Sequence, residues 1–172
     1  MKRYIFFLVS LLLFVTIQIV LLRHLAIRNV TPDLILIGVV YFSLKHGPTL
    51  GIPIGFFWGL LQDLFAFGLF GANCLIKTLI GFSVGTFQKR LVRGNPMSQI
   101  FVVFFTCLFQ YWSMYWIKIF FGQPPPQVPF FVVIFYPVYN SLLAPLLFWI
   151  MEQWEKLWGG GVYAPERNRS AI

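Results

Sequence analysis

The stretch GPTLGIPIGFFWGLLQD, residues 47–63, has a glycine at every fourth position as far as Gly59 and ends in a carboxylate. On an α-helix a step of four residues advances about 400°, so Gly47, Gly51, Gly55 and Gly59 lie along one side and leave a groove. An interior glycine costs a helix in water about 1 kcal/mol relative to alanine. In a bilayer, small residues instead allow the close van der Waals packing that holds helices together. The stretch therefore predicts a membrane helix that contacts another helix through its glycines.

The composition independently indicates a membrane protein. Of the 172 residues, 59% are hydrophobic and only 10% are charged. A chain of this length holds about five to six crossings of about 20 residues each, which leaves no room for a second folded domain. We therefore predict an all-α, polytopic bundle over residues 1–155, followed by a disordered cytoplasmic tail over residues 156–172.

The apolar runs, and the polar, glycine and proline residues between them, predict about six helical segments. These cover residues 4–22, 33–44, 48–65, 72–87, 97–120 and 130–149. The second segment rises only about 18 Å, against a hydrocarbon core of about 30 Å. Whether it spans the bilayer fully or is re-entrant is left open. The fourth segment carries Gly81 and Gly85, a second pair of glycines spaced by four and a natural partner for the first set.

The distribution of basic residues predicts the orientation of the bundle. With a cytoplasmic N-terminus and six segments, the lysines and arginines on the inner side are Lys2, Arg3, Lys45, Lys89, Arg90, Arg93, Lys156, Arg167 and Arg169. Only Arg23 and Arg28 lie on the outer side, while Lys77 and Lys118 fall within helices. This asymmetry follows the positive-inside rule and predicts that both termini are cytoplasmic. A net charge of +8 dispersed in this way does not indicate a nucleic-acid partner.

The sequence offers few groups for chemistry. It contains five acidic residues and two histidines, and no recognisable catalytic set, phosphate-binding loop or metal-ligand spacing. We therefore predict a protein that is not an enzyme and that has no metal site and no cofactor.

Two charged side chains inside the apolar sequence need an explanation. Asp63 and Lys77 are predicted to lie at similar depths on neighbouring helices, where an unpaired charge is costly. One interpretation is an ion pair between them. The other is that Asp63 caps the turn toward Gly68 while Lys77 extends outward to the headgroups. Both stay open at this point. Asn73 is predicted to cap the fourth segment, and Asp33 is predicted to start the second.

The order of these features resembles the MreD family of rod shape-determining membrane proteins. The resemblance covers roughly residues 1–155. It is most specific from 32 to 93, through Pro32, Asp33, Gly59, Asp63, Gly71 and Arg90. It implies a bundle similar to the substrate-binding subunits of energy-coupling-factor transporters, located in the bacterial cytoplasmic membrane. It also implies a scaffold role in cell elongation and lateral peptidoglycan synthesis. MreC is the implied direct partner, with indirect association to MreB, RodA and a class B penicillin-binding protein.

A second function is compatible with this fold, because a fold does not fix a function. The alternative is a small-molecule binding subunit of an ATP-driven uptake transporter. Such a subunit presents convergent polar groups to a pocket. Here the candidates Asp63, Asn73, Lys77, Gln110 and Asn140 form no recognisable binding motif. The scaffold is therefore the favoured interpretation.

Overall fold

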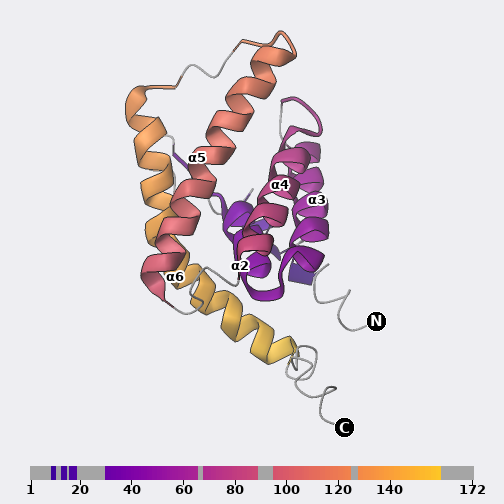
Figure 1. Ribbon diagram of the computed structural model, residues 1–172, viewed down its shortest axis with the longest axis vertical. Helices are drawn as coiled ribbons and strands as arrows, with labels where there is room; N and C mark the ends of the chain where they lie inside the picture. The colour runs from indigo at the N-terminus through magenta and orange to yellow at the C-terminus, as the bar shows by residue number, and fades with distance from the viewer. Residues whose placement is uncertain are drawn as a thin grey trace.

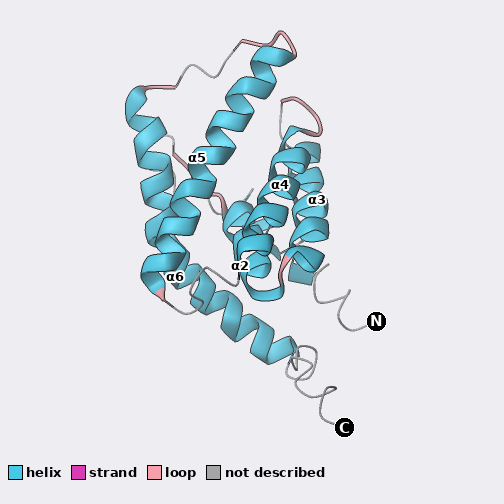
Figure 2. Ribbon diagram, viewed as in Figure 1, coloured by secondary structure: helices cyan, strands magenta, loops and turns pink. Residues whose placement is uncertain are grey.

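The computed structural model describes residues 9–10, 13–14, 16–18, 30–65, 68–88, 95–124 and 128–159. In these ranges the elements with defined bounds are all α-helices (Figures 1 and 2): α2 (Leu34–His46), α3 (Pro48–Phe65), α4 (Ala72–Phe87), α5 (Pro96–Phe120) and α6 (Phe130–Gly159). The all-α prediction is confirmed. The predicted first segment, 4–22, lies largely outside the described residues, as do Arg90, most of the basic residues used for the orientation and the tail beyond Gly159.

The glycine and proline residues explain why the predicted bounds of α3 and α4 agree with the structure. α2 and α3 form the predicted tight hairpin, since Gly47 alone separates them. Its φ of 77° is a left-handed conformation that favours glycine, and Pro48 then starts α3. Gly47 therefore lies in the turn, and only Gly51, Gly55 and Gly59 of the predicted set are helical. Gly71, with a φ of 92°, similarly precedes α4.

α6 is ten residues longer than predicted. The sequence from Ile150 to Trp158 contains neither glycine nor proline, so nothing in it ends the helix. α6 also continues through Pro137 and Pro145, and Figure 1 shows that it changes direction along its length. A proline in a helix interior removes a hydrogen bond and bends the helix. The bend lets the C-terminal part of α6 reach α2.

α2 is the centre of the molecule. Eleven of its 13 residues are buried, and it contacts α3, α4, α5 and α6. In Figure 1, α3 and α4 lie together on one side and α5 and α6 on the other. Because neighbouring helices enclose α2, its short length does not have to match the thickness of the hydrocarbon.

Two of the described helices are long and apolar enough to cross a membrane. They are Pro96–Phe120 and Phe130–Leu157, with mean hydropathy of 1.5 and 1.8. In the most apolar stretch of each helix, only 22% of the residues are buried in the protein. Their outward faces are therefore rich in exposed large hydrophobic side chains, such as Phe101, Phe105, Leu142 and Trp149. Such faces are typical of helices that contact lipid or another apolar helix.

Three described residues of the predicted first segment contact the bundle. Ser10 accepts a hydrogen bond from Trp154 Nε1 at 3.1 Å. The ring centroids of Phe14 and Trp58 are 5.4 Å apart. The side chain of Gln18 donates to the Pro32 carbonyl at 3.0 Å and accepts from the Leu34 amide at 2.8 Å. Since positions 10, 14 and 18 share one helix face, this face lies against α2, α3 and α6.

Candidate functional site

The glycines of α3 and α4 lie against backbone of the opposite helix. We call Gly51, Gly55 and Gly59 of α3, with Gly81 and Gly85 of α4, the glycine interface. A Cβ added at Gly51 would lie 2.6 Å from the Gly81 carbonyl oxygen, and one added at Gly59 would lie 2.6 Å from the Asn73 carbonyl oxygen. Both separations are well below an ordinary carbon contact of about 3.5 Å. The two backbones therefore approach at a distance that only glycine permits.

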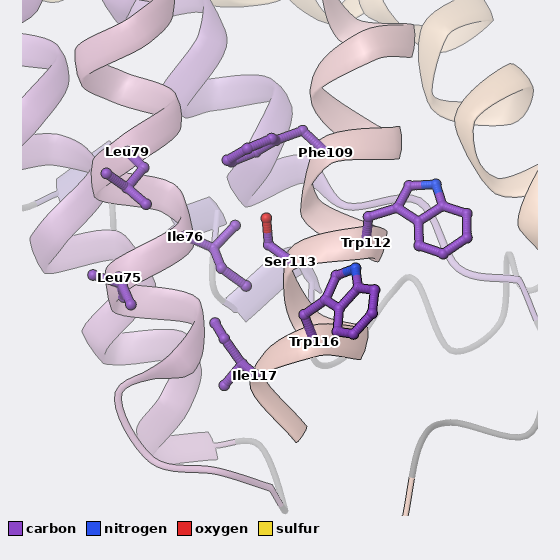
Figure 3. A pocket seen from close by; sticks show the side chains of 8 residues that line it. All are labelled: Leu75, Ile76, Leu79, Phe109, Trp112, Ser113, Trp116 and Ile117. Carbon is purple, nitrogen blue, oxygen red and sulfur yellow. The ribbon is translucent and has the colours of Figure 1, made fainter. Parts of the chain in front are cut away.

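α4 and α5, in contrast, are separated by a cleft of about 450 Å³. It is lined by Leu75, Ile76, Leu79, Phe109, Trp112, Ser113, Trp116 and Ile117, and we call it the apolar cleft. Figure 3 shows Leu75 and Leu79 of α4 across from Phe109 and Ser113 of α5. The rim tryptophans are exposed, Trp116 by 62%. This open cleft can contact an apolar chain or one face of a helix, and Ser113 is the only hydroxyl among its lining residues.

Behind the cleft lies a polar cluster of Asp33, Lys77 and Asn140, which are buried, and of Gln110 and Tyr136, which are half-buried; we call it the buried polar cluster. Lys77 Nζ lies 3.1 Å from Asp33 Oδ2 and 2.9 Å from Gln110 Oε1. Gln110 Nε2 in turn donates to Asp33 Oδ2 at 2.9 Å and to the Tyr136 hydroxyl at 3.0 Å. The cluster joins α4, α5 and α6 to the start of α2. No part of the Lys77 side chain is exposed, so its charge depends on these partners.

The main chain fixes the position of Asp33 within the cluster. Its Oδ1 accepts from the Leu36 amide at 2.8 Å, which is the N-cap bond predicted for this helix. Its own amide donates to Asn140 Oδ1 at 2.7 Å. Asn140 Nδ2 donates to the Tyr136 carbonyl at 2.8 Å, so the amide group of Asn140 is held on both sides.

The structure corrects both interpretations that were left open for Asp63 and Lys77: the two side chains do not pair with each other, and Lys77 is fully buried instead of extending to the headgroups. Lys77 pairs with Asp33, and Asp63 instead accepts from α4 at its first turn. Asn73 N and Cys74 N donate to the Asp63 carboxylate at 3.1 and 2.9 Å, and Asn73 Nδ2 donates at 2.8 Å. The predicted cap role of Asn73 is also wrong, since the cap position is Gly71 and Asn73 is a donor to Asp63. The reason is rotational: the Lys77 backbone faces Gly55, which directs its side chain away from α3.

A second charged cluster was missed in the sequence. Glu155 of α6, which is 4% exposed, forms an ion pair with Lys45 of α2, lies 3.0 Å from His46 Nε2 through Oε1, and accepts from the Tyr41 hydroxyl at 3.0 Å. The sequence pattern placed Lys45 in the polar turn between the second and third segments and Glu155 in the C-terminal tail, so it did not bring the two together. The available signal was the uninterrupted helical sequence after residue 149, which carries Glu155 back to the end of α2.

The residues that the structure describes do not indicate a metal site or a reactive thiol. No group of three or more histidine, cysteine or acidic side chains lies close enough to hold a metal ion there. Cys74 and Cys107 are free thiols, and both are buried in packed surroundings.

The sequence of this helical bundle matches a known protein family. A family model described as rod shape-determining protein MreD matches residues 1–157. The chain belongs to the MreD family. The match includes all five described helices as far as Leu157 and both charged clusters. Searches of curated proteins and of solved structures return no significant match.

Membership in the MreD family makes this a rod-shape-determining membrane protein. The family is a shape-determining one and is not known for catalysis. Of the residues that carried the resemblance, Asp33 holds Lys77, Gly59 contacts α4 and Asp63 caps α4. The Pro32 carbonyl accepts from Gln18. Four of the six residues that carry the resemblance thus join helices to each other, while Gly71 lies in the turn before α4 and Arg90 lies outside the described residues.

Proposed function

We propose that this protein is a non-enzymatic membrane scaffold of the bacterial cell-elongation machinery that binds MreC. In this role it helps to maintain rod shape and to direct lateral peptidoglycan synthesis, with indirect association to MreB, RodA and a class B penicillin-binding protein. The family match over residues 1–157 supports this assignment.

The apolar cleft is the observation that carries the proposal. The glycine interface occupies the facing sides of α3 and α4, whereas α5, among the helices that the structure describes, packs extensively only against α6 and leaves a cleft toward α4. The cleft is lined by side chains of both α4 and α5. The tryptophans at its rim offer large, rigid apolar contacts. Since apolar surfaces in hydrocarbon associate through shape and van der Waals contact, a cleft is a better seat for a helix than a flat face.

In the mechanism we propose, the cleft holds the single transmembrane helix of MreC and so fixes the orientation of the MreC domain outside the membrane. The cytoplasmic face would carry both termini and the basic residues that were counted in the sequence. The bundle would comprise six helices arranged as in the substrate-binding subunits of energy-coupling-factor transporters. The polar groups of the buried cluster are bonded to one another, which favours a structural over a solute-binding role for them.

The test is site-specific photocrosslinking in cells. A photoreactive amino acid at Trp112, in the cleft, should crosslink to MreC. The same group at Phe57, which is also well exposed but lies on α3, is the matched control. Crosslinking at Trp112 and not at Phe57 supports the proposal. Crosslinking of MreC at Phe57 alone would place the partner elsewhere, and copurification with a transport ATPase instead of MreC would favour the uptake function.

A further inference from the structure

The apolar cleft and the buried polar cluster share the same two helices. Ile76 lines the cleft, and the next residue on α4 is Lys77. Phe109 lines it from α5, and the next residue is Gln110. The hydrogen bond of 2.9 Å from Lys77 Nζ to Gln110 Oε1 therefore joins the two walls of the cleft directly behind its lining.

The position of Lys77 is fixed from the opposite side by the glycine interface. A Cβ added at Gly55 would lie 2.7 Å from the carbonyl carbon of Lys77 and 3.0 Å from Cα of Thr78. The α4 backbone at Lys77 thus rests on α3, while its side chain extends toward Asp33 and Gln110. A shift of α4 away from α3 at this point moves the ammonium group with it.

Gln110 is held by three neighbours. Its Oε1 accepts from Lys77, and its Nε2 donates to both Asp33 Oδ2 and the Tyr136 hydroxyl. Asp33 belongs to the buried start of α2, and Tyr136 to α6. The side-chain amide of Gln110 thereby links α5 to α4, to α6 and to the start of α2 at the same level of the bundle. Elsewhere α4 and α5 pack sparsely against each other.

We propose that Gln110 is a positioning residue that sets the width of the apolar cleft, and that Lys77 couples this width to the packing of α3 against α4. The coupling is a property of the bundle itself and holds whatever molecule occupies the cleft. Hydrogen bonds within hydrocarbon have no competing water, so they keep their partners at a defined separation. A change at the glycine interface is transmitted to the cleft through one side chain.

The experiment measures the distance between α4 and α5 by pulsed electron paramagnetic resonance in lipid nanodiscs. Spin labels go on cysteines introduced at Phe82 and Phe105, which are exposed and do not line the cleft. The two native cysteines are both buried, and the protein without introduced cysteines serves as the labelling control. In Gln110→Leu we expect a broader distribution and a mean distance longer by about 1–2 Å, a typical amplitude for a helix shift.

The matched control is Gln99→Leu, the same substitution on the same helix outside the cluster, which should leave the distribution unchanged. Tyr136→Phe removes only the hydroxyl that accepts from Gln110, and it should produce a smaller broadening in a protein that keeps its core. If Gln110→Leu does not fold, Tyr136→Phe decides the question alone. A distribution equal to the wild type in the folded variants overturns the proposal.

The coupling has its own test, with labels at Phe57 of α3 and Phe105 of α5, which are both exposed. Gly55→Ala should shift the distance between α3 and α5, because α4 moves away from α3 and Lys77 carries Gln110 and α5 with it. In the double variant with Gln110→Leu, the alanine should add no further shift of this distance, because the link through Lys77 is absent. Equal shifts in both backgrounds would show that Lys77 does not transmit the displacement.

Discussion

Replacing Gly59 by alanine tests the glycine interface at the point where α3 meets the first turn of α4. The added methyl group would lie 2.6 Å from the Asn73 carbonyl oxygen and 2.6 Å from Cα of Cys74. Carbon atoms pack at about 3.5 Å or more, so α4 must move away by about 0.9 Å at this point. Both obstacles are backbone atoms, and no side-chain rotation relieves them.

The displacement also weakens the cap of α4. The Asn73 and Cys74 amides donate to Asp63 at 3.1 and 2.9 Å, and both distances would exceed the usual hydrogen-bond range after such a shift. Overpacking of a rigid contact costs about 3 kcal/mol, a lost cap costs about 1 kcal/mol, and alanine returns about 1 kcal/mol as a better helix former. The net loss in the free energy of unfolding is about 3 kcal/mol, or roughly 100-fold in the folding equilibrium.

The assay is unfolding in mixed micelles with increasing mole fraction of sodium dodecyl sulfate, followed by the helical signal in circular dichroism. Gly68→Ala is the matched control, because a Cβ at Gly68 meets nothing within 4 Å. Gly59→Ala should unfold at a clearly lower detergent fraction, and Gly68→Ala at the wild-type fraction. If the two variants unfold together, the backbones of α3 and α4 are not in contact at Gly59, and the interpretation of the glycine spacing fails.

Three further predictions concern the charged groups. Lys77→Met leaves the buried Asp33 carboxylate without its cation and should cost about 3–5 kcal/mol in the same unfolding assay; adding Asp33→Asn should recover part of the loss, and no recovery would contradict the pairing. Asp63→Ala should cost about 1–2 kcal/mol and speed amide hydrogen exchange in the first turn of α4 but not in its last turn. Glu155→Gln weakens the contacts with Lys45 and His46, so exchange should increase after residue 150 of α6 and stay unchanged at residues 130–140; a uniform increase would argue against this local role.

The helices next to glycine and proline were predictable because those residues end helices for local reasons. α3 and α4 have the bounds that their sequences indicate, and the turn at Gly47 follows from Gly47 and Pro48. The end of α6 was predicted at Trp149, where the apolar run gives way to polar residues, yet a change in polarity does not end a helix. The contacts of Trp154 and Glu155 with Ser10 and α2 are long-range, and no local pattern carries them.

The polar cluster was only partly predictable. That charges in apolar sequence need partners is a general rule, and it correctly indicated a partner for Lys77. The choice of partner depends on the rotation of α4 about its axis. Similar helix depth made Asp63 one candidate, whereas the contact with Gly55 turns the side chain toward Asp33. Gln110 and Tyr136 complete the cluster from positions 77 and 103 residues away from Asp33 in the chain.

The enclosure of α2 has a consequence for biosynthesis. α2 leaves the ribosome long before the helices that surround it, since Lys77 follows Asp33 by 44 residues and Asn140 follows it by 107. Until those partners are made, a helix of 13 residues with an acidic start is too short and too polar at one end to rest stably in the bilayer. Its final placement must therefore wait for α6. In a nascent chain that stops after α4, α2 lacks its contacts with α5 and α6. The uncovered α2 is then a defined feature that membrane quality control can recognise.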